Sequence, residues 1–135
     1  MAEFFRVLVT GSRRWCDDAL VHSLLDERLT EQGFITVIHG DCPTGADKFA
    51  RTWAERAILL DMRQNFANIR HEPYPAYWNE LGKSAGPIRN RYMVELGADV
   101  CLAFPDAESR GTVSCMKFAR AAGIPVLNYG TVEVF

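Results

Sequence analysis

The pattern most informative about the fold is Phe4-Phe5-Arg6-Val7-Leu8-Val9-Thr10, which is followed directly by Gly11-Ser12. Apolar and β-branched residues occupy both faces of this stretch, as in a central strand of a parallel sheet that is covered on both sides. After it, Asp17 and Asp18 can cap a helix whose apolar positions between residues 20 and 29 fall on one face, and Gly33 can end that helix. The stretch therefore predicts a strand that leads into an amphipathic helix.

The alternation of strand and helix continues along the chain. Short apolar runs bounded by glycine or proline predict strands, and apolar residues at helical spacing predict helices. The predicted strands after the first are 34–39, 69–72, 100–104 and 124–127, and the predicted helices after the first are 46–57, 87–97 and 111–122. The segment 73–86, rich in tyrosine, proline and glycine, is predicted to be a loop.

Strands that alternate with helices imply a parallel sheet, because right-handed crossovers place the helices on both of its faces. We predict an α/β fold: a single Rossmann-like doubly wound domain over residues 1–135, with a mainly parallel sheet of about five strands and helices on both faces. Ligands of such folds bind beyond the carboxyl ends of the strands, near the point where the strand order reverses. The loops after the first, second and fourth strands are therefore the expected site.

Composition and charge exclude several classes of protein. The chain has 135 residues, 48% of them hydrophobic and 24% charged, which is typical of a folded domain with a sizeable core. Its net charge of −2 gives no global basic field, so a nucleic-acid partner is disfavoured. The longest apolar run, 100–104, is far shorter than the about 20 residues that a membrane-spanning helix needs, so no membrane partner is expected. Four irregularly spaced cysteines without a Cys-x-x-Cys pair argue against a metal site and against a disulfide framework, and a cytoplasmic location is expected.

The first loop, 10–15, combines groups that suit a phosphate. Gly11 lets the backbone approach a ligand closely, Ser12 can donate a hydrogen bond, and Arg13 can donate two in parallel. Trp15 adds an aromatic surface at the same place. The loop lacks the G-x-G-x-x-G fingerprint of dinucleotide-binding proteins, and an ordinary turn with solvated arginines is the alternative.

The second loop, 40–47, precedes a helix whose start carries little side-chain bulk. Gly40, Gly45 and Ala46 leave room for a ligand to lie against it. Asp47 would accept hydrogen bonds from ribose hydroxyls, as acidic residues do in dinucleotide-binding folds. The alternative is an acidic residue that only complements the helix dipole.

The third segment, 78–91, mixes tryptophan, lysine, arginine and asparagine with small residues. Arg89 and Asn90 fall in the first turn of the predicted helix, where a cation is disfavoured unless an anion is bound nearby. This local conflict indicates function, whereas arginines that project into solvent are the alternative, which we favour for Arg91. The candidate ligand contacts of this segment are Trp78, Gly86, Pro87, Arg89 and Asn90.

The fourth loop, 105–112, again ends at the start of a predicted helix. Gly111 and Thr112 offer close approach and a hydroxyl group, so the loop can form a second phosphate cradle with Pro105 and Ser109. A simple helix cap by Ser109 or Thr112 is the alternative.

Four motifs in this order resemble those of the YspA/YpsA-related branch of the SLOG superfamily. They are Gly11-Ser12-Arg13, Gly45-Ala46-Asp47, Ala85-Gly86-Pro87-Ile88-Arg89-Asn90 and Ser109-x-Gly111-Thr112. The similarity spans nearly the whole chain, and its most specific part is the third motif. It implies a Rossmann-like fold, a bacterial or phage source, and binding or processing of a nucleotide-derived ligand.

The same superfamily contains phosphoribohydrolases that activate cytokinins, with the signature Pro-Gly-Gly-x-Gly-Thr-x-x-Glu. The chain departs from that signature, because Cys115 stands where the resemblance places the catalytic glutamate. Asp47 and Glu80 are then the candidates for a catalytic carboxylate. Whether the protein is an enzyme stays open at this point.

Three functions are compatible with these loops. The first is binding, without a required cofactor, of a nucleoside monophosphate or an ADP-ribose-like molecule at the carboxyl ends of the strands. The second is hydrolysis of the N-glycosidic bond of a nucleoside monophosphate. The third, single-stranded DNA binding as in the related DNA-processing protein A, is disfavoured by the net charge. The resemblance also allows self-association, for which apolar positions within 87–96 are available.

Overall fold

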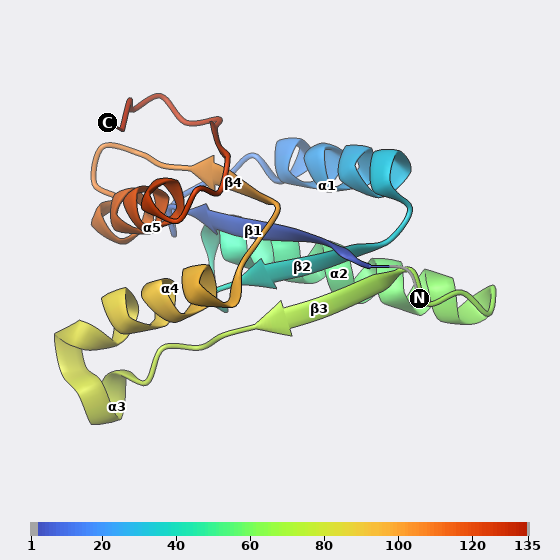
Figure 1. Cartoon of the computed structure of the whole chain (residues 1–135), viewed down its shortest axis with the longest axis horizontal. Helices are drawn as coiled ribbons and strands as arrows, with labels where there is room; N and C mark the ends of the chain where they lie inside the picture. Colours follow the sequence, from blue (N-terminus) through green and yellow to red (C-terminus); the bar gives the residue numbers. More distant parts are fainter. Residues whose placement is uncertain (1–2, 135) are drawn as a thin grey trace.

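Strand β1 (Phe5–Gly11) lies at the centre of the sheet, as the sequence predicts (Figure 1). The structure is a computed structural model, and it describes residues 3–134. All strand pairs are parallel, and the strand order is β3-β2-β1-β4-β5. The other strands are β2 (Ile35–His39), β3 (Ile69–Pro73), β4 (Val100–Phe104) and β5 (Val126–Asn128). The helices are α1 (Asp18–Gln32), α2 (Gly45–Arg63), α3 (Trp78–Leu81), α4 (Ala85–Leu96) and α5 (Arg110–Ala121), and a 3₁₀ turn, η1 (Gly82–Ser84), joins α3 to α4.

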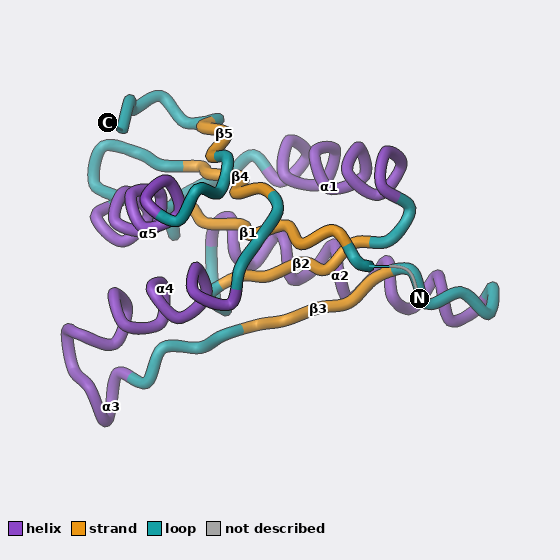
Figure 2. Tube along the Cα trace, in the orientation of Figure 1, coloured by secondary structure: helices purple, strands orange, loops and turns teal. Residues whose placement is uncertain are grey.

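Alternate residues of β1 enter two separate cores, because successive side chains of a strand point to opposite faces. Val7 and Val9 pack with the buried residues of α1 and α2 on one face. Leu8 packs with those of α4 and α5 on the other face. The sheet therefore lies between two pairs of helices (Figure 2), which confirms the predicted α/β doubly wound fold.

Helix α1 begins and ends where the sequence predicts. The side chain of Asp17 accepts a hydrogen bond of 3.0 Å from the backbone N–H of Leu20. At the other end, Gly33 has a φ of 81° and its N–H donates to the carbonyl of Leu29. The acidic cap and the left-handed glycine satisfy backbone groups that the helix leaves unpaired at its two ends.

Several predicted boundaries are wrong. The segment 73–86 is not a continuous loop but contains α3 and η1, and α4 begins at Ala85 rather than at Pro87. A proline is tolerated at this third helical position because the first N–H groups of a helix have no partner within it. Helix α2 continues to Arg63, beyond the predicted end at residue 57. Strand β5 starts at Val126, two residues later than predicted, because the N–H of Ile124 still donates to Ala119 at the end of α5.

The strand order reverses at β1, since the chain moves outwards through β2 and β3 and then returns to β4 on the other side. At such a point the loops that leave the two neighbouring strands diverge and open a crevice at the carboxyl ends of the strands. Here the diverging loops are β1–α1 and β4–α5, which leave β1 and β4 in opposite directions towards the two helical layers. Among residues 3–134, no helix is both long and apolar enough to cross a membrane.

Gly45 allows the start of α2 to approach the β1–α1 loop. Its φ is 76°, and a Cβ atom at this position would meet the backbone of Ser12 and Arg13. Next to it, the N–H of Ala46 donates to the carbonyl of Ser12 over 3.3 Å. The backbones of two of the predicted ligand loops are therefore in direct contact.

We expect Gly45→Ala to destabilise the fold by about 3 kcal/mol or more, the sum of left-handed strain and of an unavoidable backbone clash. The matched control is Gly33→Ala, which has a similar φ of 81° but open space around its Cβ position. The control should lose only about 1–2 kcal/mol. Urea denaturation of the two variants measures the difference, and an equal loss in both would contradict the tight contact at Gly45.

Candidate ligand-binding site

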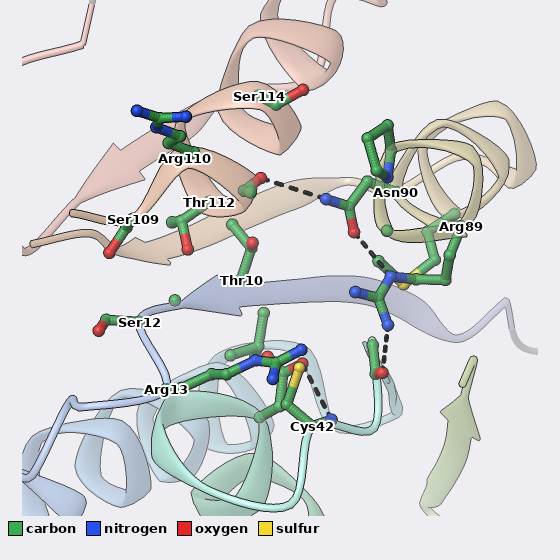
Figure 3. A pocket seen from close by; sticks show the side chains of 18 of the residues that line it. Thr10, Ser12, Arg13, Cys42, Arg89, Asn90, Ser109, Arg110, Thr112 and Ser114 are labelled. Atoms are coloured by element: carbon green, nitrogen blue, oxygen red, sulfur yellow. Dashed lines mark hydrogen bonds between the residues drawn. The ribbon is translucent and has the colours of Figure 1, made fainter. Parts of the chain in front are cut away.

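A cavity of about 790 Å³ opens at the carboxyl ends of the strands beside β1 (Figure 3). It receives residues from all four candidate segments, 10–15, 40–47, 78–91 and 105–112, which are far apart in the sequence. The predicted contacts that line it are Gly11, Ser12, Arg13, Gly40, Asp47, Trp78, Gly86, Pro87, Arg89, Asn90, Ser109, Gly111 and Thr112.

The remaining predicted contacts do not line the cavity. Trp15 instead packs on Phe104, with ring centroids 5.2 Å apart, and its indole N–H donates to the carbonyl of Asp17. Gly45 and Ala46 are buried against the β1–α1 loop, and Pro105 is buried against Gly130. Sequence reasoning missed several lining residues that lie within three residues of predicted ones, namely Thr10, Arg14, Cys42, Lys83, Glu108, Arg110 and Ser114.

Arg89 joins the ends of two strands at one side of the cavity. Its Nη1 donates to the carbonyls of Gly40, just after β2, and of Tyr74, just after β3, the latter over 3.2 Å. A Cβ atom on Gly40 would clash with this guanidinium group, so glycine at this position leaves room for it. Nε of Arg89 donates to Asn90 over 2.7 Å, and the amide of Asn90 donates to the carbonyl of Gly111 over 3.1 Å. The pair thus links β2, β3, α4 and the start of α5.

The position of Arg89 corrects the sequence argument about it. Because α4 begins at Ala85, Arg89 is in the second turn of the helix and not in the first. The helix dipole falls off within the first turn and does not determine the placement of this cation. Two backbone carbonyls hold it instead, and Figure 3 shows its remaining amino group directed into the cavity.

Asp47 is a buried carboxyl group on the cavity wall, with only 5% of its surface exposed. Burial raises the pKa of Asp47, while the thiol of Cys42 and the charge of Arg89 oppose that rise. The N–H of Cys42 donates to Oδ2 of Asp47 over 3.4 Å. Burial and the nearby Asp47 also raise the pKa of Cys42 to about 11, so this thiol keeps its proton at neutral pH. The carboxyl can accept hydrogen bonds from a ligand and can exchange a proton with it.

Neither Glu80, the other catalytic candidate, nor Cys115, the residue at the position of the signature glutamate, can supply a carboxylate to the cavity. Glu80 is exposed on α3 and does not line the cavity. Cys115 is fully buried in the core between the sheet and α4 and α5, and burial raises its pKa to about 11. A buried, protonated thiol supplies neither a carboxylate nor a nucleophile.

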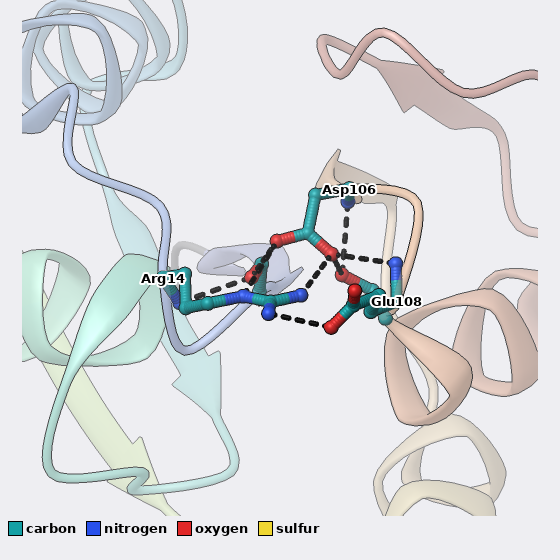
Figure 4. A network of polar contacts seen from close by, with 5 residues as sticks. Arg14, Asp106 and Glu108 are labelled. Atoms are coloured by element: carbon teal, nitrogen blue, oxygen red, sulfur yellow. Dashed lines mark hydrogen bonds and ion pairs between the residues drawn. The ribbon is translucent and has the colours of Figure 1, made fainter.

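A network of polar contacts closes one rim of the cavity and joins the β1–α1 and β4–α5 loops (Figure 4). Oδ2 of Asp106 accepts a hydrogen bond of 2.5 Å from Ser12, and Oδ1 accepts one of 2.7 Å from Ser109. Arg14 forms ion pairs with Asp106 at 3.2 Å and with Glu108 at 2.6 Å. We call this set of five residues the rim clasp.

The rim clasp changes the expected roles of Ser12 and Ser109. Both hydroxyl hydrogens point to Asp106 and are therefore committed within the protein. Hydrogen bonds from these two hydroxyls hold the pKa of Asp106 well below its usual range. Sequence reasoning identified both loops but not this pairing, because 94 residues separate Ser12 from Asp106.

The histidines make internal contacts. Nδ1 of His39 accepts a hydrogen bond of 2.9 Å from the N–H of Asp41, so its proton is on Nε2, which lies 2.6 Å from Nε2 of His71. Burial and the charges of His71 and two arginines lower the pKa of His39 to about 3, which keeps the ring neutral. The pair supports the turn after β2, where Asp41 has a φ of 56°. Within residues 3–134, no group of three or more His, Cys, Asp or Glu side chains is arranged to hold a metal ion.

The cavity has an excess of cationic groups. Arg13, Lys83 and Arg110 line it, and their side chains form no ion pair within the described part of the chain. Arg14 is neutralised by the rim clasp. The N-terminus of α5 adds the positive end of a helix dipole, with no acidic residue in its first turn. The arrangement suits an anionic ligand.

The parallel sheet with helices on both faces, with a cationic cavity where the strand order reverses, defines a Rossmann-like α/β domain. The family model described as "YspA, cpYpsA-related SLOG family" matches residues 5–79. The chain is also 46% identical over 126 residues to the "Gene 61 protein" of Mycobacterium phage D29. This alignment covers 93% of this chain and 96% of that protein. The chain belongs to the YspA, cpYpsA-related SLOG family, which confirms the resemblance seen in its motifs. No solved structure matches it significantly.

We expect Asp106→Asn to lower the melting temperature at neutral pH more than Glu108→Gln does. Asp106 accepts hydrogen bonds from two hydroxyls and from Arg14, whereas Glu108 pairs with Arg14 alone. The lowered pKa of Asp106 also contributes stability that is complete above its unfolded-state pKa of about 4 and is lost as the pH falls through the folded value. Thermal melts from neutral to acidic pH should therefore show a weaker acid destabilisation in Asp106→Asn than in the wild type. Parallel profiles would contradict this role of Asp106.

Proposed function

We propose that the protein binds a nucleotide or a nucleotide-derived ligand, of the nucleoside monophosphate or ADP-ribose type, in the cavity beside β1. The observation that carries this proposal is the set of cations without ion-pair partners around a cavity at the reversal of strand order. A volume of about 790 Å³ falls in the range of pockets for small organic ligands, which is roughly 300–1,000 Å³. Membership of the SLOG family supports a nucleotide-related role.

The start of α5 is the proposed phosphate subsite. Gly111 and Thr112 lie in its first turn, where backbone N–H groups have no partner within the helix. Ser109, at the cap position, makes no side-chain hydrogen bond to these groups because its hydroxyl is committed to Asp106. A phosphate at this point would accept hydrogen bonds from the free amides and would neutralise Arg110.

Asp47 is the proposed ribose contact. Its carboxyl group lines the same cavity and is close enough to Arg89 for the cation to affect its pKa. A carboxylate accepts hydrogen bonds from two neighbouring ribose hydroxyls in many nucleotide sites. The ligand would thus extend from the start of α5 towards the start of α2.

A second candidate function, hydrolysis of an N-glycosidic bond, is favoured by the burial of Asp47. A carboxyl group with a raised pKa can act as a general acid, and in its ionised form it can stabilise an oxocarbenium-like ribosyl centre. With Glu80 outside the cavity and Cys115 buried as a thiol, Asp47 is the carboxyl group best placed for this chemistry.

The binding proposal is tested by thermal melts and calorimetry with nucleoside monophosphates, ADP-ribose, NAD and ATP. A ligand at 100 times its Kd stabilises a protein by about 2.7 kcal/mol, which corresponds to a rise in Tm of roughly 8–12 °C for a domain of this size. Arg110→Gln should weaken binding by about 10- to 150-fold, the effect of losing one charge-assisted hydrogen bond. The matched control Arg91→Gln should leave affinity unchanged, because Arg91 is exposed on α4 and pairs with Glu95. No shift with any nucleotide would overturn the proposal.

We expect Asp47→Asn to raise the stability of the protein at neutral pH and to abolish any hydrolytic activity. The raised pKa of Asp47 means that its ionised form destabilises the fold, and that the stability present at low pH is lost as the pH rises through the folded value. The amide should therefore stabilise the protein at neutral pH by roughly 0.5–2 kcal/mol, as substitutions at functional sites often do. If the protein hydrolyses nucleoside monophosphates, release of the free base should disappear in this variant, as measured by chromatography. A lower Tm for Asp47→Asn would contradict the assigned environment of Asp47.

A further inference from the structure

Arg13 and Trp78 face each other across the cavity. Cζ of Arg13 lies over the indole ring of Trp78, 5.8 Å from its centroid. The two residues come from different parts of the fold, since Arg13 follows β1 and Trp78 is the first residue of α3. Both line the cavity, and Trp78 is 46% exposed. Figure 3 shows Arg13 reaching into the cavity above Cys42, from the side opposite Arg89.

The separation of this pair is larger than that of a direct contact. Elsewhere in the same molecule, Cζ of Arg70 lies only 3.9 Å from the ring centroid of Phe4, which is a closed cation–π contact. A planar ring stacked between two planar groups requires about 7 Å, twice a contact distance of roughly 3.5 Å. The Arg13–Trp78 distance of 5.8 Å is shorter than this, so a base enters between the two groups only if the Arg13 side chain moves outward.

One side of the pair is held in place and the other is free to move. A Cβ atom on Gly86 would lie 3.0 Å from Cη2 of Trp78, so the six-membered ring of the indole rests directly on α4. Arg13, in contrast, is exposed on a loop and forms no ion pair within residues 3–134. The Trp78 ring is therefore held against α4, whereas the Arg13 side chain can change its conformation when a ligand binds.

Of the aromatic residues in this region, Trp78 is the one placed to stack on a ligand in the main cavity. Tyr74 and Tyr77 line a separate cavity of about 380 Å³ between α3 and α4, and Trp15 packs on Phe104. Among the described residues that line the main cavity, Trp78 supplies the aromatic surface.

We propose that Arg13 and Trp78 form a clamp that stacks on the two faces of a planar heterocyclic base, with purines bound more tightly than pyrimidines. The inference rests on the proposed nucleotide-binding function and identifies the part of the ligand that these two residues bind. Stacking on the indole and cation–π attraction to the guanidinium both increase with the area of the base. Because the clamp contacts the faces of the base and not its edges, it favours binding of a nucleotide over a sugar phosphate. It discriminates little between adenine and guanine.

The test compares AMP, CMP and ribose 5-phosphate by isothermal titration calorimetry. The wild type should bind AMP about 5- to 150-fold more tightly than ribose 5-phosphate, the usual effect of stacking one base, and more tightly than CMP. Trp78→Leu should remove most of this preference and leave the affinity for ribose 5-phosphate unchanged, while Trp78→Phe should retain part of it. Tyr77→Leu is the matched control, because Tyr77 is 63% exposed and lines the neighbouring cavity.

Arg13→Gln is the second variant, and it keeps the test valid if Trp78→Leu does not fold. It should reduce the preference for AMP over ribose 5-phosphate with no change in the Tm of the unliganded protein. Equal affinities of the wild type for AMP and ribose 5-phosphate, or a preference that survives in both Trp78→Leu and Arg13→Gln, would overturn the clamp and leave the binding function intact. Equal affinities for AMP and CMP would overturn the purine preference. Binding of none of these three compounds, and of neither ADP-ribose, NAD nor ATP, would overturn the proposed function and the clamp with it.

Discussion

The contact of the Arg89 guanidinium group with the carbonyls of Gly40 and Tyr74 is the interaction on which the architecture of the cavity depends. Parallel strands end with their carbonyl groups at one edge of the sheet, and the chain must turn there without a neighbouring strand to pair with. One cation satisfies carbonyls that follow two adjacent strands, and Asn90 extends the same network to the start of α5. The absence of a side chain at Gly40 is what makes the approach of the guanidinium possible.

The polar groups around the cavity divide into those already used by the protein and those left for a ligand. Ser12, Ser109 and Arg14 are committed to Asp106, and Arg89 is largely committed to backbone carbonyls. Arg13, Lys83 and Arg110 form no ion pair, and the N–H groups of Gly111 and Thr112 have no backbone partner, within the described residues. A sequence motif therefore overstates the number of ligand contacts, because part of a conspicuous polar loop serves to hold the loop itself.

The chain combines the family fold with a departure in its chemistry. Cys115, at the position where the resemblance to the cytokinin-activating phosphoribohydrolases would place a glutamate, is buried as a protonated thiol. Asp47 supplies a carboxyl group to the cavity from another helix, α2, with a pKa raised by burial. The cavity therefore contains an acid–base group on α2 and none at position 115, an arrangement compatible with the proposed binding and with the proposed hydrolysis.

The alternation of strands and helices, the two faces of the core and the loops that surround the cavity follow from the sequence alone, because they depend on local periodicity and on glycine and proline positions. The predicted start of α4 at Pro87 is wrong, because local sequence signals do not show that a helix begins before its proline. Arg89 therefore lies in the second turn of the helix and not in the first, as predicted. The contacts that give the site its chemistry exist only in the tertiary structure. Arg14 and Asp106 are 92 residues apart, Arg89 and Gly40 are 49 apart, and His39 and His71 are 32 apart. Each pair meets only because parallel crossovers return the chain to the same edge of the sheet, and no local pattern encodes which side chains will meet there.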